Sequence, residues 1–233
     1  MASSQQAVPR FYFSLRSPYS WLAYRRLTEH HPDVAASVEW RPFFEPDADS
    51  AALLREAGGH FPYTDMSRDK HLYILQDVRR CARDAGLTPV WPVDRDPVWE
   101  VPHLAYLAAV DEGRGPDLLR RLYELRWEEG RDICDRAVVA EAAAGLGLPA
   151  GRLAAASDDS GLRARGIAAL RAVDRDGVFG VPFFVHGRDK FWGLDRLGAF
   201  VASVLGARPH DPAPPPELVL GADGDQGHAG GCG

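Results

Sequence analysis

The sequence predicts an α/β fold interrupted by a long helical insertion, and three observations lead to that prediction. Residues 10–43 have the pattern of a strand, a helix and a second strand in succession. Residues 48–176 carry apolar positions at helical spacing, over a length that exceeds any ordinary connecting loop. Residues 183–205 then predict a hairpin followed by a last helix.

The opening strand–helix–strand unit depends on the turn chemistry of Ser17 and Pro18. Residues 10–15 are short and aromatic, as in a buried strand, and helical spacing begins directly after the turn. Ser17 is a natural N-cap, and Pro18 suits the first helical position because its missing N–H would have no partner there. Apolar and charged residues alternate over residues 37–43, which predicts the second strand.

Gly and Pro residues separate the predicted helices of the insertion and mark the hairpin that follows. The helices are expected at residues 66–85, 98–112, 116–128, 136–145 and 161–176. Two short apolar runs, residues 183–186 and 190–192, flank a turn and predict the hairpin. The final helix is expected at residues 194–205.

This order of elements is expected of a thioredoxin-like fold that carries a large all-helical insertion. The thioredoxin-like domain should comprise residues 8–46 and 177–206, and the helical insertion domain residues 47–176. Residues 207–233 are too rich in Pro and Gly to pack, which predicts a disordered tail.

Composition and charge exclude several classes of protein. The chain has 45% hydrophobic and 26% charged residues, so its 233 residues can bury a core without disulfides. A net charge of −6 offers no basic field to a nucleic acid. No apolar run approaches the roughly 20 residues of a membrane span, and the first residues lack the apolar core of a signal peptide. We therefore expect a cytoplasmic protein.

Metal and disulfide chemistry are not expected either. The three cysteines, Cys81, Cys134 and Cys232, are far apart in the sequence and form no C-x-x-C pair. Neither the cysteines nor the histidines show the spacing of metal ligands, so we expect no metal site.

Two local motifs carry the chemistry. Residues 17–20 (SPYS) stand at the strand-to-helix turn, where a helix N-terminus offers unpaired N–H groups and the positive end of its dipole. A hydroxyl there can donate a hydrogen bond to a bound thiolate, and the dipole lowers the pKa of the thiol. Taken alone, the motif is more typical of a plain helix cap. In the second motif, residues 177–184, general statistics favour a trans Val181-Pro182 bond.

With these motifs the chain resembles the 2-hydroxychromene-2-carboxylate isomerases and the kappa-class glutathione transferases, the glutathione-using branch of the DsbA-like thioredoxin superfamily. The resemblance covers residues 10–202 and is carried by FYFSLRSPYSWLAYRRL at one end and by GVFGVPFFV and FWGLDRL at the other. KHLYILQDVRR and WEEGRDICD continue it through the middle. It implies the DsbA/kappa type of thioredoxin-like fold.

The resemblance implies roles for residues at both ends of the chain. Ser17 corresponds to the family's catalytic serine, which holds the sulfur of glutathione as a thiolate. Val181 and Pro182 correspond to a cis-proline turn, in which the Val181 backbone pairs with the cysteinyl backbone of the tripeptide. Asp195, with Arg196 beside it, corresponds to the motif that holds the γ-glutamyl end, where a carboxylate receives an ammonium group.

Two positions depart from the family pattern. Ser14 stands where the family commonly has Asp, and Leu194 where it has Ser or Asn, so one contact to the γ-glutamyl group is lost. Mycothiol or another small thiol is therefore an alternative to glutathione.

Four residues are candidates for binding the second substrate. Lys70 and Tyr73 share one face of the predicted helix, and Lys70 matches a family position that suits a substrate carboxylate. Arg16 can attract an anion at the mouth of the site, and Tyr19 belongs to the SPYS motif.

The resemblance thus implies an isomerase of the 2-hydroxychromene-2-carboxylate type, which uses a bound thiol to act on an aromatic or quinonoid substrate, in a homodimer by analogy. One alternative is a kappa-like glutathione transferase, which differs only in releasing the adduct. Another is a repurposed non-redox thioredoxin-like protein of an aromatic natural-product pathway. Disulfide exchange is disfavoured because Ser17 and Ser20 occupy both cysteine positions of the redox enzymes.

Overall fold

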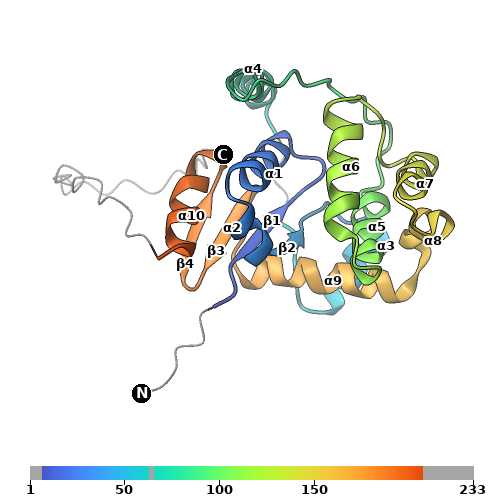
Figure 1. Cartoon of the computed structure of the whole chain (residues 1–233). Helices are drawn as coiled ribbons and strands as arrows, with labels where there is room; N and C mark the ends of the chain where they lie inside the picture. Colours follow the sequence, from blue (N-terminus) through green and yellow to red (C-terminus); the bar gives the residue numbers. More distant parts are fainter. Residues whose placement is uncertain (1–6, 63–65, 207–233) are drawn as a thin grey trace, which may run out of the picture.

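A four-stranded sheet with helices around it makes up the computed structural model, which describes residues 7–62 and 66–206 (Figure 1). The strand order is β2-β1-β3-β4. β1 (Arg10–Phe13) and β2 (Glu39–Pro42) are parallel, whereas β3 (Phe183–His186) is antiparallel to both β1 and β4 (Asp189–Trp192). The tail predicted at residues 207–233 lies outside the described residues.

Most of the helices lie in the sequence between β2 and β3, and the others follow β1 or β4. They are α1 (Pro18–His30), α2 (Pro32–Ser37), α3 (Ala48–Glu56), α4 (Arg68–Asp84), α5 (Glu100–Asp111), α6 (Gly115–Trp127), α7 (Arg136–Gly145), α8 (Ala150–Ala154), α9 (Ser160–Arg175) and α10 (Leu197–Val204). In Figure 1, α5 to α8 lie to one side of the sheet, α9 runs from them back to the strands, and α4 lies beyond α1. The predicted α/β class with a helical insertion is confirmed.

Most element bounds agree with the prediction to within a few residues, and the differences concern short elements. The sequence analysis does not single out α2, α3 or α8, which have six, nine and five residues and so offer too few turns for a periodic pattern. The final helix begins as a 3₁₀ turn, η2 (Leu194–Arg196), before α10. No helix among the described residues is long and apolar enough to cross a membrane.

The two faces of the sheet pack into different hydrophobic clusters. Phe11 and Phe13 point to one face, where Phe184 stacks on Phe11 with ring centroids 4.5 Å apart. Phe13 also meets Tyr106 of α5 edge-on at 5.2 Å, so this cluster continues from the sheet into the inserted helices. Tyr12 points to the opposite face, where it joins residues from the end of α9 and from β3. The strand that leads to Ser17 is therefore held from both sides.

Candidate active site

The register of the sheet brings four separate segments to one of its edges. Phe13 pairs with Pro42 in β2, and Tyr12 pairs with Phe183 in β3, which in turn pairs with Trp192 in β4. The chain that follows β1, β2 and β4, and the chain that precedes β3, therefore meet at the same end of the strands. These segments contain residues 14–17, 43–45, 181–182 and 193–196, and so most of the residues that the resemblance singles out.

Ser17 caps α1 as predicted. Its Oγ accepts the N–H of Ser20 at 3.2 Å, and Pro18 occupies the first helical position. Because the oxygen serves as the acceptor in this bond, the hydroxyl proton is free to be donated to another group. Ser17 is half-buried, so this proton and the positive end of the helix are open to a bound anion.

The second cysteine position of the redox enzymes is also filled by a serine. Ser20 is buried and its Oγ accepts the N–H of Ser14 at 3.3 Å. The two free cysteines among the described residues, Cys81 and Cys134, both have thiol pKa values raised above the ordinary range, chiefly by burial. The described part of the chain therefore presents no activated thiol of its own beside Ser17.

The Val181-Pro182 bond at the neighbouring segment is cis, as the resemblance implies and against the general statistics. Pro182 is buried and Val181 is half-buried. The Pro182 carbonyl accepts the N–H of Gly193 at 2.9 Å, which joins the turn to the segment after β4. Gly193 has φ +96°, a conformation that only glycine adopts readily, and this lets the chain turn directly into Asp195.

Asp195 and Arg196 lie on the η2 turn with their side chains mostly exposed. An Arg196 Nη1 lies 3.1 Å from an oxygen of Asp195, so each charge is the other's partner in a solvent-accessible pair. Such a pair is worth little by itself and exchanges easily for a ligand's charges.

The hydroxyl of Tyr19 is hydrogen-bonded to a residue of α4. The phenol donates to Asp77 Oδ2 at 2.7 Å, and Arg80 holds the other oxygen of Asp77 at 2.9 Å. Burial and the Asp77 carboxylate raise the pKa of Tyr19, and the hydrogen bond from Tyr19 lowers the pKa of Asp77. Tyr19 therefore links α1 to α4, and its hydroxyl proton is donated to Asp77 in this structure.

Lys70 and Tyr73 lie on α4, the helix that the Tyr19–Asp77 hydrogen bond joins to α1. Tyr73 is 56% exposed, with Arg80 placed 5.9 Å from its ring. Lys70 makes no ion pair with any residue of the described ranges, 7–62 and 66–206. Both side chains share the face of α4 that carries Asp77 toward Tyr19.

Arg16 is paired at the mouth of the site. Its Nη1 lies 2.7 Å from Glu45, and its guanidinium lies 5.6 Å from the ring of Trp99 at the start of α5. Arg16 and Glu45 are both about half exposed, so this ion pair is weak and an incoming anion can compete for the arginine. The sequence analysis does not single out Glu45.

The inserted helices hold the backbone just before Ser17. The N–H of Leu15 donates to His103 Nε2 at 3.1 Å, and the Leu15 carbonyl accepts from Trp127 Nε1 at 3.2 Å. The Ser14 carbonyl accepts from the hydroxyl of Tyr123 at 3.2 Å. The sequence analysis missed these three contributors. The signal that could have found His103 is a single polar side chain in the apolar run of α5, because a buried polar group needs a partner.

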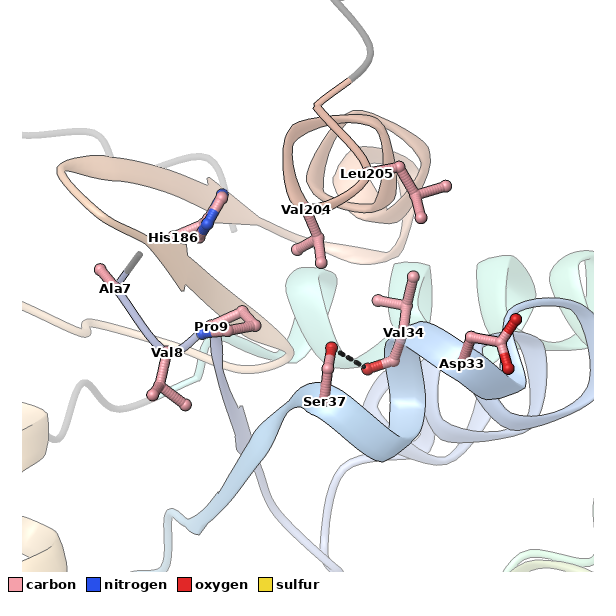
Figure 2. Close-up of a pocket in the computed structure, with 9 residues that line it drawn as sticks. All are labelled: Ala7, Val8, Pro9, Asp33, Val34, Ser37, His186, Val204 and Leu205. Carbon is pink, nitrogen blue, oxygen red and sulfur yellow. Dashed lines mark hydrogen bonds between the residues drawn. The ribbon is translucent and has the colours of Figure 1, made fainter. Parts of the chain in front are cut away.

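A cavity at the opposite end of the sheet is separate from these groups. It has a volume of about 410 Å³ and is lined by Val8 and Pro9 ahead of β1, by His186 at the end of β3, and by Val34 and Leu205 (Figure 2). Its walls are mainly apolar, and none of the residues proposed for chemistry lies in it. Among the described residues no group of His, Cys, Asp and Glu side chains is arranged to hold a metal ion.

Comparison with known proteins agrees with this architecture. Residues 10–204 match the family described as the DSBA-like thioredoxin domain. A 2-hydroxychromene-2-carboxylate isomerase from Sphingobium xenophagum is 28% identical over 197 residues, which cover 84% of this chain and 96% of that protein.

Two solved structures show the same fold. A 2-hydroxychromene-2-carboxylate isomerase superposes with a TM-score of 0.66 at 23% identity, over 85% of this chain and 94% of that one. The cytosolic disulfide reductase DsbM from Pseudomonas aeruginosa, solved with GSH, superposes with a TM-score of 0.55 at 21% identity, over 85% of this chain and 98% of that one. The thioredoxin-like fold with its helical insertion is thus confirmed, and the chain belongs to the DsbA-like thioredoxin domain family.

Proposed function

We propose that this chain is a thiol-dependent isomerase of the 2-hydroxychromene-2-carboxylate type. The observation that carries the proposal is the placement of Ser17. Its hydroxyl caps α1 and keeps a proton to donate, at the edge of the sheet where the cis Val181-Pro182 turn also lies. Ser20 stands at the second cysteine position of the redox enzymes. That arrangement can stabilise the thiolate of a bound molecule, whereas it cannot form a mixed disulfide.

The residues present fit a small thiol. Ser17 would donate its proton to the sulfur, and the N-terminus of α1 would add the favourable end of its dipole. The Val181 backbone would pair with the peptide of the thiol, and Asp195 would exchange its exposed partner Arg196 for the ligand's ammonium group. When bound, the thiol supplies a sulfur nucleophile that adds to an activated C=C bond and is eliminated unchanged after rotation, so that the net reaction is an isomerisation.

The chain's own contribution is to hold charge and geometry. Ser17 and the helix end keep the sulfur deprotonated near neutral pH, which raises the concentration of the reactive form. Arg16, only weakly held by Glu45, would receive a substrate carboxylate at the mouth of the site, and Lys70 would meet a second anionic group from α4. Tyr73, largely exposed on the same face, would contact a flat ring.

Two comparisons support this proposal. The Sphingobium relative is named as this isomerase, and the match covers 96% of its length. The DsbM structure was solved with GSH. The identity of the thiol is a separate part of the proposal, because Ser14 is buried with its Oγ accepting the N–H of Arg16, and Leu194 is buried as well. Ser14 lacks the carboxylate and Leu194 lacks the polar group that the family commonly has at these positions, so mycothiol is tested beside glutathione.

The test is a spectroscopic titration of the thiolate absorption of each thiol against wild type and Ser17→Ala. A hydrogen bond to a charged group is worth about 1.5–3 kcal/mol. Loss of that bond should therefore raise the pKa of the bound thiol by about one to two units. Wild type should hold the pKa of one thiol below the roughly 8.5 of a free cysteine.

Ser67→Ala is the matched control for the loss of a helix cap. Ser67 caps α4 through the same bond, from Lys70 N–H to Ser67 Oγ at 3.2 Å, and lies outside the proposed thiol site. Both alanine variants should lose about 1 kcal/mol of stability, but only Ser17→Ala should change the thiol pKa. If neither thiol binds to wild type, the proposal is wrong. If a stable adduct with substrate accumulates, the chain is a kappa-like transferase.

The proposal also includes a homodimer and a cytoplasmic location. Sedimentation equilibrium at micromolar concentration tests the first, and fractionation of the producing cells tests the second. A monomer at every concentration would refute the dimer and leave the thiol site unaffected.

A further inference from the structure

One polar side chain on the buried face of α5 is bonded at both of its ring nitrogens. His103 is 0% exposed, and its ring lies stacked near Phe13 and Phe44. Its Nδ1 lies 2.8 Å from the carbonyl oxygen of Trp99, one turn earlier in the same helix. Its Nε2 lies 3.1 Å from the backbone nitrogen of Leu15, which is 88 residues away in the sequence.

These two partners determine where the ring proton is. A carbonyl oxygen can only accept, so Nδ1 must carry the hydrogen, and a backbone N–H can only donate, so Nε2 must offer its lone pair. The imidazole is therefore neutral and present as a single tautomer. Protonation of Nε2 would set two N–H groups against each other in the core. Burial and the nearby positive charge of Arg126 also disfavour the charged imidazole.

The bond to Leu15 acts on the peptide that leads to Ser17. The carbonyl of Leu15 accepts from Trp127 on α6, so that residue is held on both sides by inserted helices. Only Arg16 separates this held residue from Ser17, and its side chain is half exposed. The backbone directly before Ser17 is thus held by contacts that originate outside the sheet.

We propose that His103 is a positioning residue for the thiolate site: its neutral imidazole accepts the Leu15 N–H and so sets where the Ser17 hydroxyl meets the bound sulfur. The inference rests on the proposed function, since it concerns the thiol that Ser17 is proposed to hold. Without the acceptor, the Leu15 N–H is left buried and unpaired, and the segment must shift to reach another partner. Small displacements of a positioned group are costly when the interaction depends on alignment.

Two variants distinguish the loss of the hydrogen-bond acceptor at His103 from the loss of its ring. His103→Phe keeps a flat ring and removes the acceptor, whereas His103→Gln keeps an acceptor oxygen. In the thiolate titration we expect His103→Phe to raise the pKa of the bound thiol by about one unit, which is a tenfold fall in the ratio of thiolate to thiol at a given pH. His103→Gln should recover part of that loss.

His186→Phe is the matched control. His186 is half-buried, and its Nδ1 is likewise bonded, to Ser203 Oγ at 2.9 Å. It lines the cavity at the opposite end of the sheet (Figure 2). It should leave the thiol pKa unchanged. If Ser17→Ala abolishes the pKa shift while both His103 variants keep it, the positioning role is refuted and the proposed function stands. If wild type shows no shift, the proposed function itself fails, and the positioning role fails with it.

A measurement on wild type covers the case in which His103→Phe does not fold. Nitrogen-15 NMR of the imidazole distinguishes the two neutral tautomers, and we expect the Nδ1–H form near neutral pH. Observation of the Nε2–H form or of the charged ring would overturn the inference without any variant.

Discussion

Acidification should destabilise this protein through His103. The ring is fully buried and neutral, and burial lowers its pKa from 6.5 to about 3. In the unfolded chain the same ring has its ordinary pKa, so below about pH 6.5 only the unfolded state binds the proton. The stability that depends on the neutral ring is therefore fully present above that pH and is lost as the pH falls toward about 3.

The magnitude follows from the width of that window. Each pH unit between the two pKa values costs about 1.4 kcal/mol, so a change from pH 7 to pH 5 should lower the free energy of unfolding by about 2 kcal/mol. Urea unfolding of wild type and His103→Gln at pH 7, 6 and 5 measures this, because the amide does not titrate and the other histidines contribute equally to both proteins. Equal pH dependence in the two proteins over this range would refute the reasoning.

The remaining predictions concern packing and charge around the same framework. Asp94→Asn should cost about 3 kcal/mol in urea unfolding, because Asp94 is the bidentate partner of the nearly fully buried Arg126; a loss below 1 kcal/mol would contradict this. Tyr19→Phe should raise the pKa of the Asp77 carboxyl toward its ordinary value, as followed by NMR titration, since the phenol is the main cause of its depression; an unchanged pKa would show that the bond is absent. Phe200→Ala should cost about 3–5 kcal/mol, because its ring is fully buried; calorimetry checks this, and a neutral effect would place Phe200 outside the core.

The opening of the fold is predictable because its signals are local. Ser17 and Pro18 define the start of α1 through a cap bond that spans three residues, so the pattern contains both partners. β3 is found at the residues expected, since a short apolar run between turns leaves few alternatives. By contrast α2, with six residues, and α8, with five, have no periodic pattern to detect.

The candidate site is predictable only in part. The resemblance singles out Ser17 and the Val181-Pro182 turn, and the sheet register places both at one edge. It gives no indication that the Tyr19 phenol is committed to Asp77, 58 residues away, because that bond exists only where α4 packs against α1.

The sequence by itself determined the helix cap at Ser17 and the absence of a C-x-x-C pair, because each depends on residue types within a few positions of one another. It also determined the fold class, through the order of its predicted elements. Only the tertiary structure decided which groups hold Ser17 in place. The bond from Leu15 to His103 joins residues 88 positions apart, and it forms because α5 packs beside the end of β1. Which distant polar groups meet depends on how helices pack, and local spacing carries no information about that.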